Sequence, residues 1–340
     1  MNETKYLVGT KVISTVDNTR AEMLGPMTGS RVVSARLYYP AQEGTGSLTT
    51  IEDALGTMYK DAEPVKEEQF PIIVYNHGLG QPVESNNYMC CELASTGYLV
   101  VAVGHAYEAS QIVLENGTVI KQDKNLNKMS IKPAVPALVA MKKLQKSNGT
   151  PVELYKEFLD FQRKYASFMV DRLNQWAKDI LVIVAEVKNR YADLIDVKAG
   201  IGITGHSFGG NLAYYMCHKY DGFKCGVNID GPLFGHYDDN DMTKPFFQIC
   251  SSGNVNCETR SLFGSVAPIY YTVFKNLEHL GFTDKKLTSK SKNAYGSMPP
   301  GVMGARLVSV NLQFFNKFLK YSGEDIDMSN NENFEAKKVR

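Results

Sequence analysis

The chain has 340 residues, of which 44% are hydrophobic and 21% are charged, a composition typical of a globular protein with a substantial apolar core. Its 37 basic and 36 acidic residues nearly cancel, which argues against binding to nucleic acid or to an anionic membrane surface through overall charge. No apolar run approaches the length of about 18 residues that a membrane-spanning helix needs, so no transmembrane segment is predicted.

The N-terminal sequence lacks the basic and apolar regions of a signal peptide, so we expect a cytoplasmic protein unless a leader has been removed. The six cysteines show neither CxxC spacing nor a paired framework: Cys90, Cys91, Cys217, Cys225, Cys250 and Cys257. This pattern indicates reduced, structural thiols. Because Cys and His residues do not cluster in the sequence, we also expect no zinc site.

Strand-like and helix-like segments alternate along most of the chain, which predicts an α/β fold with a mainly parallel central sheet covered by helices on both faces. Residues 5–15 and 31–40 have the pattern of two opening strands, which we expect to form a hairpin-like pair at the sheet edge. Continuous apolar runs at residues 70–76 and 98–103 are typical of central strands buried on both faces. Between them, residues 89–97 are expected to form a helix that ends at Gly97.

This alternation stops between residues 107 and 165. Polar, loop-like sequence is followed there by helical periodicity, which Asn148, Gly149 and Pro151 interrupt. An insertion of this length between sheet elements is usually functional rather than a plain connection. We therefore expect residues 107–165 to form a lid or cap.

The alternation then resumes with a long amphipathic helix. The segments predicted after residue 165 are helices at 166–191, 212–220 and 305–321 and strands at 199–205, 225–230, 244–252 and 268–276, the last of these being the final strand. Residues 322–340 are polar and have no apolar period, so we expect a loose C-terminal tail. The folded domain would accordingly span residues 1–321.

A serine between glycines marks the junction of the strand at 199–205 with the helix that follows. Residues 205–209, Gly-His-Ser-Phe-Gly, fit the G-x-S-x-G pattern. Between a buried strand and a helix, this pattern is typical of a nucleophile elbow, which raises the serine hydroxyl above the sheet edge. We therefore predict that Ser207 is a nucleophile, the alternative being a purely structural strand-to-helix turn.

A second glycine motif follows the strand at 70–76. The sequence His77-Gly78-Leu79-Gly80 is similar to the loop that supplies an oxyanion-hole amide in lipases and esterases. The predicted oxyanion donors are the backbone amides of Leu79 and Phe208. The alternative is that the loop is an ordinary glycine-rich turn.

The base that would activate the serine is one of six histidines: His77, His105, His206, His218, His236 and His279. His77 and His206 lie inside the two glycine motifs, where their side chains are expected to support the turns, and His218 lies far along a helix. His279 follows the strand at 268–276, which agrees with the chain order serine, acid, histidine of the α/β-hydrolases. We favour His279, with His236 as the main alternative.

The acid that would orient the base is predicted from the ends of strands. Asp230 ends the apolar strand at 225–230, so its carboxylate is expected at the carboxyl edge of the sheet, close to the serine. The next strand, where many α/β-hydrolases carry the acid, ends in two serines, and the first carboxylate after it belongs to Glu258. We favour Asp230, with Glu258 as the alternative.

These motifs together resemble the platelet-activating-factor acetylhydrolase-like branch of the α/β-hydrolases. The resemblance is carried by "NHGLG", "GYLVVAVGHAYEAS", "GHSFGG", "NIDG" and "EHLGFTD", and dienelactone-hydrolase-like and polyester-cleaving esterases share much of it. It implies an α/β-hydrolase fold with Ser207, Asp230 and His279 as the catalytic residues and with Leu79 and Phe208 at the oxyanion hole.

One loop departs from that family's pattern. A charged string of the HRD type often follows the family's first histidine-bearing strand end, whereas this chain has His105-Ala106-Tyr107-Glu108. Because that loop shapes the substrate pocket in the family, the resemblance implies an altered pocket here. The residues expected to line it are His105, Tyr107 and His206.

The expected function is cleavage of carboxylic esters through an acyl-enzyme, without a metal ion or a cofactor. The expected substrate is a small-molecule or lipid-like ester, with a short acyl group of the acetyl type or a polyester as examples. The alternatives are an amidase or thioesterase that uses the same residues, and a non-catalytic binding protein with the same fold. The sequence indicates neither the natural ester nor the oligomeric state.

Overall fold

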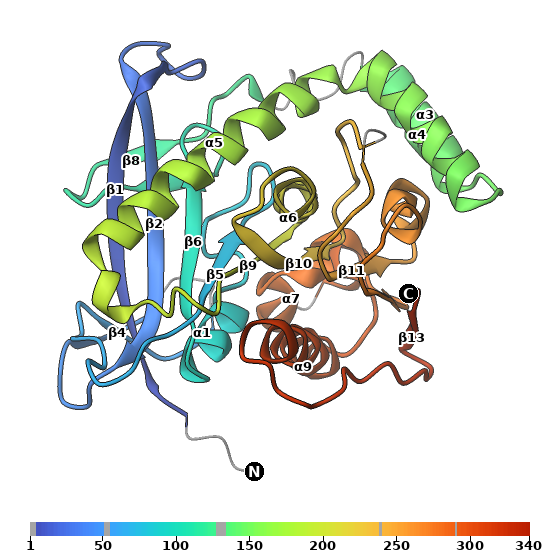
Figure 1. Cartoon of the computed structure of the whole chain (residues 1–340). Helices are drawn as coiled ribbons and strands as arrows, with labels where there is room; N and C mark the ends of the chain where they lie inside the picture. The colour runs from blue at the N-terminus through green and yellow to red at the C-terminus, as the bar shows by residue number, and fades with distance from the viewer. Residues whose placement is uncertain (1–4, 51–54, 127–133, 238–239, 290) are drawn as a thin grey trace.

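A computed structural model describes residues 5–50, 55–126, 134–237, 240–289 and 291–340. Its centre is an eleven-stranded sheet (Figure 1). In sheet order the strands are β13 (Phe334–Lys338), β12 (Ile269–Phe274), β11 (Phe246–Ser251), β10 (Phe223–Ile229), β9 (Ile201–His206), β5 (Ile72–Asn76), β6 (Leu99–His105), β2 (Ser30–Ala41), β1 (Leu7–Ala21), β4 (Met58–Lys60) and β3 (Ser47–Thr49). The expected α/β architecture is confirmed.

The middle of the sheet is parallel. The strands β6, β5, β9, β10, β11 and β12 pair in parallel with their neighbours. The two opening strands pair antiparallel with each other, and β2 joins them to β6. In this arrangement the carboxyl ends of β5, β9, β10 and β11 all lie at one edge of the sheet, which is where ligands bind in open α/β sheets.

Helices cover both faces of the sheet, as expected. The helices α5 (Ser167–Arg190) and α6 (Phe208–Lys219) pack on one face, and α1 (Asn87–Ser95) and α9 (Pro300–Leu319) pack on the other. Every residue of β5 is buried, with Ile72 and Val74 in the core under α5 and Ile73 and Tyr75 in the core under α1 and α9. Successive side chains of a strand point to opposite faces, so this apolar run belongs to two cores at once.

The insertion contains a short hairpin of β7 (Gln111–Val113) and β8 (Val119–Lys121), followed by α3 (Ala134–Gln145) and α4 (Pro151–Tyr165). The two helices lie side by side beyond the N-terminal end of α5 (Figure 1). Thr150 begins α4 with a capping box in which its hydroxyl and the Glu153 side chain satisfy each other's backbone amides. Residues 127–133 of the expected lid lie outside the described residues, and a lid function stays a prediction.

The expectation of a loose C-terminal tail was wrong. Residues Phe334–Lys338 form β13, which pairs antiparallel with β12, so the segment at 268–276 is not the final strand. The sequence hid this strand because only Phe334 and Ala336 of β13 are buried. A short edge strand needs few inward apolar residues, and its charged residues face solvent.

Two smaller expectations concern cysteines and membranes. All six cysteines are buried and free, which confirms the expectation of reduced, structural thiols. Across the described ranges, no helix has the length and hydropathy required to cross a bilayer. Short helical segments complete the fold: η1 (Ala192–Leu194), η2 (Val255–Cys257), η3 (Thr259–Leu262), η4 (His279–Phe282), α7 (Lys285–Thr288) and α8 (Lys292–Tyr295).

Candidate active site

Ser207 lies at the sharp turn between β9 and α6. Its backbone has φ 58° and ψ −124°, a conformation that non-glycine residues rarely adopt and that is found mostly at functional sites. The backbone around it is packed so closely that a side chain at Gly209 would overlap the carbonyl of Asn76 on β5. The glycines are therefore required by close approach, as the elbow pattern predicts.

The structure brings Ser207, His279 and Asp230 together. Ser207 Oγ lies 2.8 Å from Nε2 of His279, and Nδ1 of the same ring lies 2.7 Å from Oδ2 of Asp230. His279 begins the turn η4 and its side chain is 36% exposed, whereas Asp230 directly follows β10 and is fully buried. The carboxylate acceptor assigns a proton to Nδ1, which leaves Nε2 free to accept the serine proton.

Neutral hydrogen-bond donors surround the Asp230 carboxylate. The backbone amide of Ser251 donates to Oδ1, while the Ser251 hydroxyl at 3.0 Å and the Asn254 side-chain amide at 2.9 Å donate to Oδ2. Burial opposes ionisation of this carboxyl, but the hydrogen bond and charge of His279 and the amide of Ser251 outweigh burial and keep its pKa below the ordinary value. Asp230 is therefore ionised at neutral pH.

Glu258, the alternative acid, lies behind Asp230 and does not contact His279 in the part of the chain that the structure describes. It is fully buried, accepts a hydrogen bond from the Gln248 amide, and lies 2.6 Å from Cys250 Sγ. Burial, and secondly the charge of Asp230, raise its pKa well above the ordinary value. A neutral carboxyl in this position is not placed to orient the ring, so the geometry favours Asp230.

The glycine loop after β5 passes beside the serine. A side chain added at Gly78 would lie 3.0 Å from Cβ of Ser207. The loop is held by hydrogen bonds from Gly78 N–H to Gln81 Oε1 at 3.2 Å and from Gly80 N–H to the Glu108 carbonyl at 2.7 Å. Among the hydrogen bonds of the described residues, none uses the amide of Leu79 or Phe208. Both predicted oxyanion donors are therefore available, and their role stays a prediction.

The structure does not support His105 as a pocket residue. Its ring is fully buried under α5, where Nδ1 lies 2.9 Å from Asp179 Oδ2 and the ring stacks on Trp176 at 3.6 Å between centroids. Burial lowers its pKa to about 4. As the last residue of a strand buried on both faces, it points into the core under α5 instead of outward.

The other two expected pocket residues also lie outside the cavity wall. Tyr107 is half-buried, with φ 63°, and its ring packs against the Gly25 backbone. His206 is buried behind the site, where Nε2 donates to the His279 carbonyl at 2.9 Å and Nδ1 lies 3.0 Å from Gln81 Oε1. It supports the turn that carries His279 and not only the turn of its own motif, and its pKa falls to about 3 through burial and the nearby His279.

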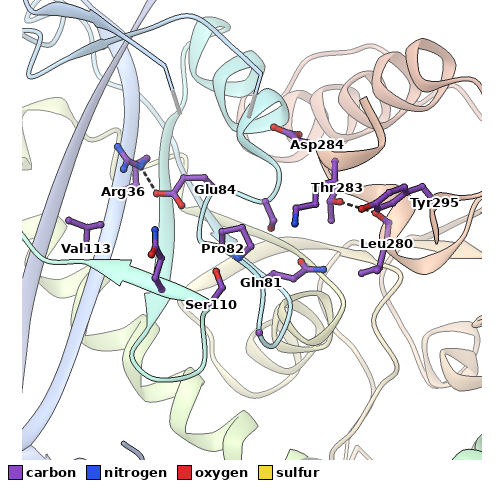
Figure 2. Close-up of a pocket in the computed structure, with 14 residues that line it drawn as sticks. Arg36, Gln81, Pro82, Glu84, Ser110, Val113, Leu280, Thr283, Asp284 and Tyr295 are labelled. Atoms are coloured by element: carbon purple, nitrogen blue, oxygen red, sulfur yellow. Dashed lines mark hydrogen bonds and ion pairs between the residues drawn. The ribbon is translucent and has the colours of Figure 1, made fainter. Parts of the chain in front are cut away.

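A cavity of about 520 Å³ adjoins the glycine loop and the turn that begins with His279 (Figure 2). Its walls come from separate parts of the chain, including residues 80–82, residues 110–111 and Leu280. Arg36 and Glu84 form an ion pair of 2.8 Å on one side. Asp284, on another side, is 4% exposed, and burial raises its pKa to about 7. Gly80, Ser110, Leu280 and Asp284 lie inside the quoted family motifs, but nothing in the sequence identified them as cavity residues.

The other candidate histidines lie away from Ser207. His236, the alternative base, is exposed, and His218 contacts the Asn240 carbonyl at the end of α6. Ser251 and Asn254, which bind Asp230, were missed as site residues because nothing in their local sequence marks them. Within the described residues, no group of three or more His, Cys, Asp or Glu residues is arranged to hold a metal ion.

Comparisons with known proteins bear on the fold and the family. The family model of platelet-activating factor acetylhydrolase, isoform II, matches residues 48–260, a range that contains Ser207 and Asp230 but ends before His279. Platelet-activating factor acetylhydrolase of Gallus gallus is 24% identical over 175 residues, which are 51% of this chain and 41% of that protein. The chain thus matches less than half the length of this relative.

Among solved structures, a ferulic acid esterase from Streptomyces cinnamoneus has the same fold. The two superpose with a TM-score of 0.74 at 19% sequence identity, covering 99% of this chain and 97% of the other. This likeness shows the α/β-hydrolase fold. Because the family model matches more than half of its residues, the chain belongs to the platelet-activating factor acetylhydrolase isoform II family.

Proposed function

We propose that this protein hydrolyses carboxylic esters with Ser207 as nucleophile, His279 as general base and Asp230 as the acid that orients the base. The observation that carries the proposal is the continuous chain of contacts from Ser207 Oγ to His279 Nε2 at 2.8 Å and from His279 Nδ1 to Asp230 at 2.7 Å. The positive φ of Ser207 adds support, since it is the conformation of a nucleophile elbow.

The reaction has two halves. Ser207 Oγ attacks the ester carbonyl carbon while its proton passes to Nε2 of His279, and the resulting imidazolium is stabilised by Asp230. The tetrahedral intermediate collapses when His279 returns the proton to the leaving alcohol, which gives an acyl-enzyme. Water then attacks the acyl group by the same proton transfers and regenerates the free serine.

The amides of Leu79 and Phe208 are proposed to bind the oxyanion that forms in each half. They flank the serine on the two glycine-rich turns, and Phe208 is the first residue of α6, where the helix N-terminus favours negative charge. Loss of one such donor typically costs about 3 kcal/mol of transition-state stabilisation. Their fixed positions, in the loop after β5 and at the start of α6, avoid reorganisation during the reaction.

The proposed substrate is a small-molecule or lipid-like ester, and its hydrolysis would be a lipid-degrading reaction in the second case. A cavity of about 520 Å³ beside the turn of His279 has the size of a small-molecule site. Membership of an acetylhydrolase family supports a short acyl group. The same residues would also cleave amides or thioesters, so matched oxoester, thioester and amide analogues of one acyl group would rank the three classes.

The first test is covalent labelling with a fluorophosphonate probe, which reacts with activated serines. Wild-type protein is expected to label, and Ser207→Ala is expected to lose the label while keeping its fold by circular dichroism. A folded wild-type protein that neither labels nor hydrolyses short-chain oxoesters would contradict the proposal. It would favour a non-catalytic binding protein with this fold.

A further inference from the structure

The segment of residues 251–258, between β11 and η3, makes contacts in two directions. Toward the site, Ser251 and Asn254 donate hydrogen bonds to the Asp230 carboxylate. Toward the insertion, η2 contacts both α3 and α4. One short segment therefore touches both the candidate acid and the hairpin formed by the helices α3 and α4.

The contacts with the hairpin are specific. The side-chain amide of Asn256 donates to the carbonyls of Leu144 at 2.9 Å and of Ser147 at 2.8 Å, at the C-terminal end of α3. The Leu144 carbonyl also accepts the Ser147 backbone amide at 3.0 Å, so Asn256 adds a second hydrogen bond there and supplies a donor to the Ser147 carbonyl just beyond the helix. Cys257 Sγ lies 3.6 Å from Met141 Sδ on the same helix. The segment is thereby attached to the end of α3.

Asn254 joins the two sets of contacts. Its Nδ2 donates to Asp230 Oδ2 at 2.9 Å, and its Oδ1 accepts from the exposed Gln145 side chain of α3 at 3.4 Å. Rotating the amide by half a turn would direct its oxygen at the carboxylate, where two acceptors would repel each other. The contact with Gln145 thus favours the orientation that supports Asp230.

The same amide competes with the base for one oxygen. Asn254 Nδ2 lies 3.1 Å from His279 Nδ1, and both groups direct a hydrogen at Asp230 Oδ2, which also accepts from Ser251 Oγ. Three donors on one carboxylate oxygen share its electron density. The strength of the Asp230–His279 hydrogen bond therefore depends on whether Asn254 stays in place.

We propose that Asn254 is a positioning residue that couples the α3–α4 hairpin to the Asp230–His279 pair, an inference that rests on the proposed ester hydrolysis. A displacement of α3 that carries Gln145 away releases the Asn254 amide. The carboxylate then loses one of its fixing donors, so its position is held less firmly while its hydrogen bond to the histidine shortens.

The test compares three variants with the wild-type protein. Asn254→Ala is expected to lower kcat about tenfold with KM within about twofold, because one hydrogen bond to a charged group is lost at the acid and not at the substrate. Gln145→Ala is expected to act in the same direction by about threefold. Ser252→Ala is the matched control, since Ser252 is exposed in the same segment, and it is expected to behave as wild type.

A spectroscopic signature separates positioning from general loosening of the fold. The proton of His279 Nδ1 that is shared with Asp230 is observable by NMR at low field. In Asn254→Ala and in Gln145→Ala this resonance is expected to move further downfield, because fewer donors compete for Oδ2 and the remaining hydrogen bond shortens. In Ser252→Ala it is expected to stay in place.

Each outcome bears on one claim. A wild-type-like resonance and kcat in Asn254→Ala would overturn the positioning role. An effect in Asn254→Ala with none in Gln145→Ala would overturn the coupling to the hairpin. Should Asn254→Ala fail to fold, the exposed Gln145→Ala decides alone. A wild-type protein without hydrolysis or serine labelling would contradict the proposed function, while the resonance, which needs no turnover, still tests Asn254.

Discussion

The molecule contains two buried carboxylates that hold a histidine in the same way. In one pair, His279 Nδ1 lies 2.7 Å from Asp230 Oδ2, and in the other, His105 Nδ1 lies 2.9 Å from Asp179 Oδ2. Both carboxylates are fully buried. Asp230 directly follows β10, and Asp179 lies on α5 and contacts His105 at the end of β6. The pairs differ in what lies beyond each histidine and in what neutralises each carboxylate.

The Asp179 carboxylate is neutralised by cations. Arg31 and Arg20 each approach it to 2.7 Å, and the Arg31 side chain also reaches Glu22 and Glu108. Burial alone would raise the pKa of Asp179, but the charge of Arg31 and the hydrogen bonds from His105 and Arg31 place it well below the ordinary value. This pair therefore belongs to a buried ion-pair network between β2 and α5.

The two histidines differ in what surrounds their second ring nitrogen, Nε2. His105 stacks on Trp176, and within the described part of the chain its Nε2 has no hydrogen-bond partner. His279 is partly exposed, and its Nε2 faces the Ser207 hydroxyl. A histidine–carboxylate pair is therefore not by itself a sign of catalysis. It becomes a base only where the second nitrogen meets a nucleophile that substrate can reach.

The largest expected effect is on the base. His279→Ala is expected to reduce kcat for a short-chain ester by about 10⁶-fold, the loss typical of removing the histidine of a serine hydrolase. Steady-state kinetics with a chromogenic ester measures it. His236→Ala, which changes an exposed histidine, serves as the control and should keep most of the activity. The reverse result would assign the base to His236.

A smaller loss is expected at the acid. Asp230→Asn should reduce kcat about 10⁴-fold, because an amide can hold His279 in the wrong tautomer. Glu258→Gln, which replaces a neutral buried carboxyl by a neutral amide, should change kcat by less than about threefold. Equal losses in the two variants, measured by the same assay, would leave the acid unassigned.

At the second pair the change should affect stability instead of chemistry. Asp179→Asn removes the buried anion that pairs with Arg31 and Arg20. Loss of one partner of a buried ion pair typically lowers the free energy of unfolding by about 3–5 kcal/mol. The midpoint of denaturant unfolding is expected to fall accordingly, while kcat of the folded protein changes less than about threefold. Lost turnover at an unchanged midpoint would show that the buried pair takes part in catalysis.

The pH dependence of stability tests the buried histidines. Burial is the main cause that lowers the pKa values of His77 and His105 to about 4 and that of His206 to about 3, from 6.5. Below pH 6.5 the unfolded chain binds protons at these residues and the folded protein does not. Stability is therefore complete above pH 6.5 and is lost on acidification.

Between pH 6.5 and 5.5 the expected loss is about 1 kcal/mol for each histidine. Asp284 and Glu258, whose pKa values burial raises, bind protons in the folded protein over this range and offset part of that loss. Unfolding midpoints across this range provide the measurement. His236→Ala, at an exposed position, should not change the slope. Stability that rises on acidification, as the two carboxyls alone would produce, would mean that the three rings are accessible to water in the folded protein.

The candidate site could be predicted only in part, and the predictions with which the geometry agrees share a cause. The elbow at residues 205–209 and the strand that ends at Asp230 are local patterns, in which turn chemistry and apolar periodicity act within a few residues. His279 followed from chain order. The misplacement of His105 has the opposite cause, because a strand buried on both faces gives no local sign of the side to which its last residue points.

The sequence by itself determined the α/β alternation and the two glycine-rich turns, and it pointed to the candidate serine and the favoured acid, because each depends on residues that are close together in the chain. Only the tertiary structure decided that β13 completes the sheet, that Arg31 and Asp179 form a buried network, and that Gln145 and Asn254 meet beside Asp230. These contacts join segments far apart in sequence. They form because the packing of the whole sheet and its helices brings those segments together, and no local pattern encodes such proximity.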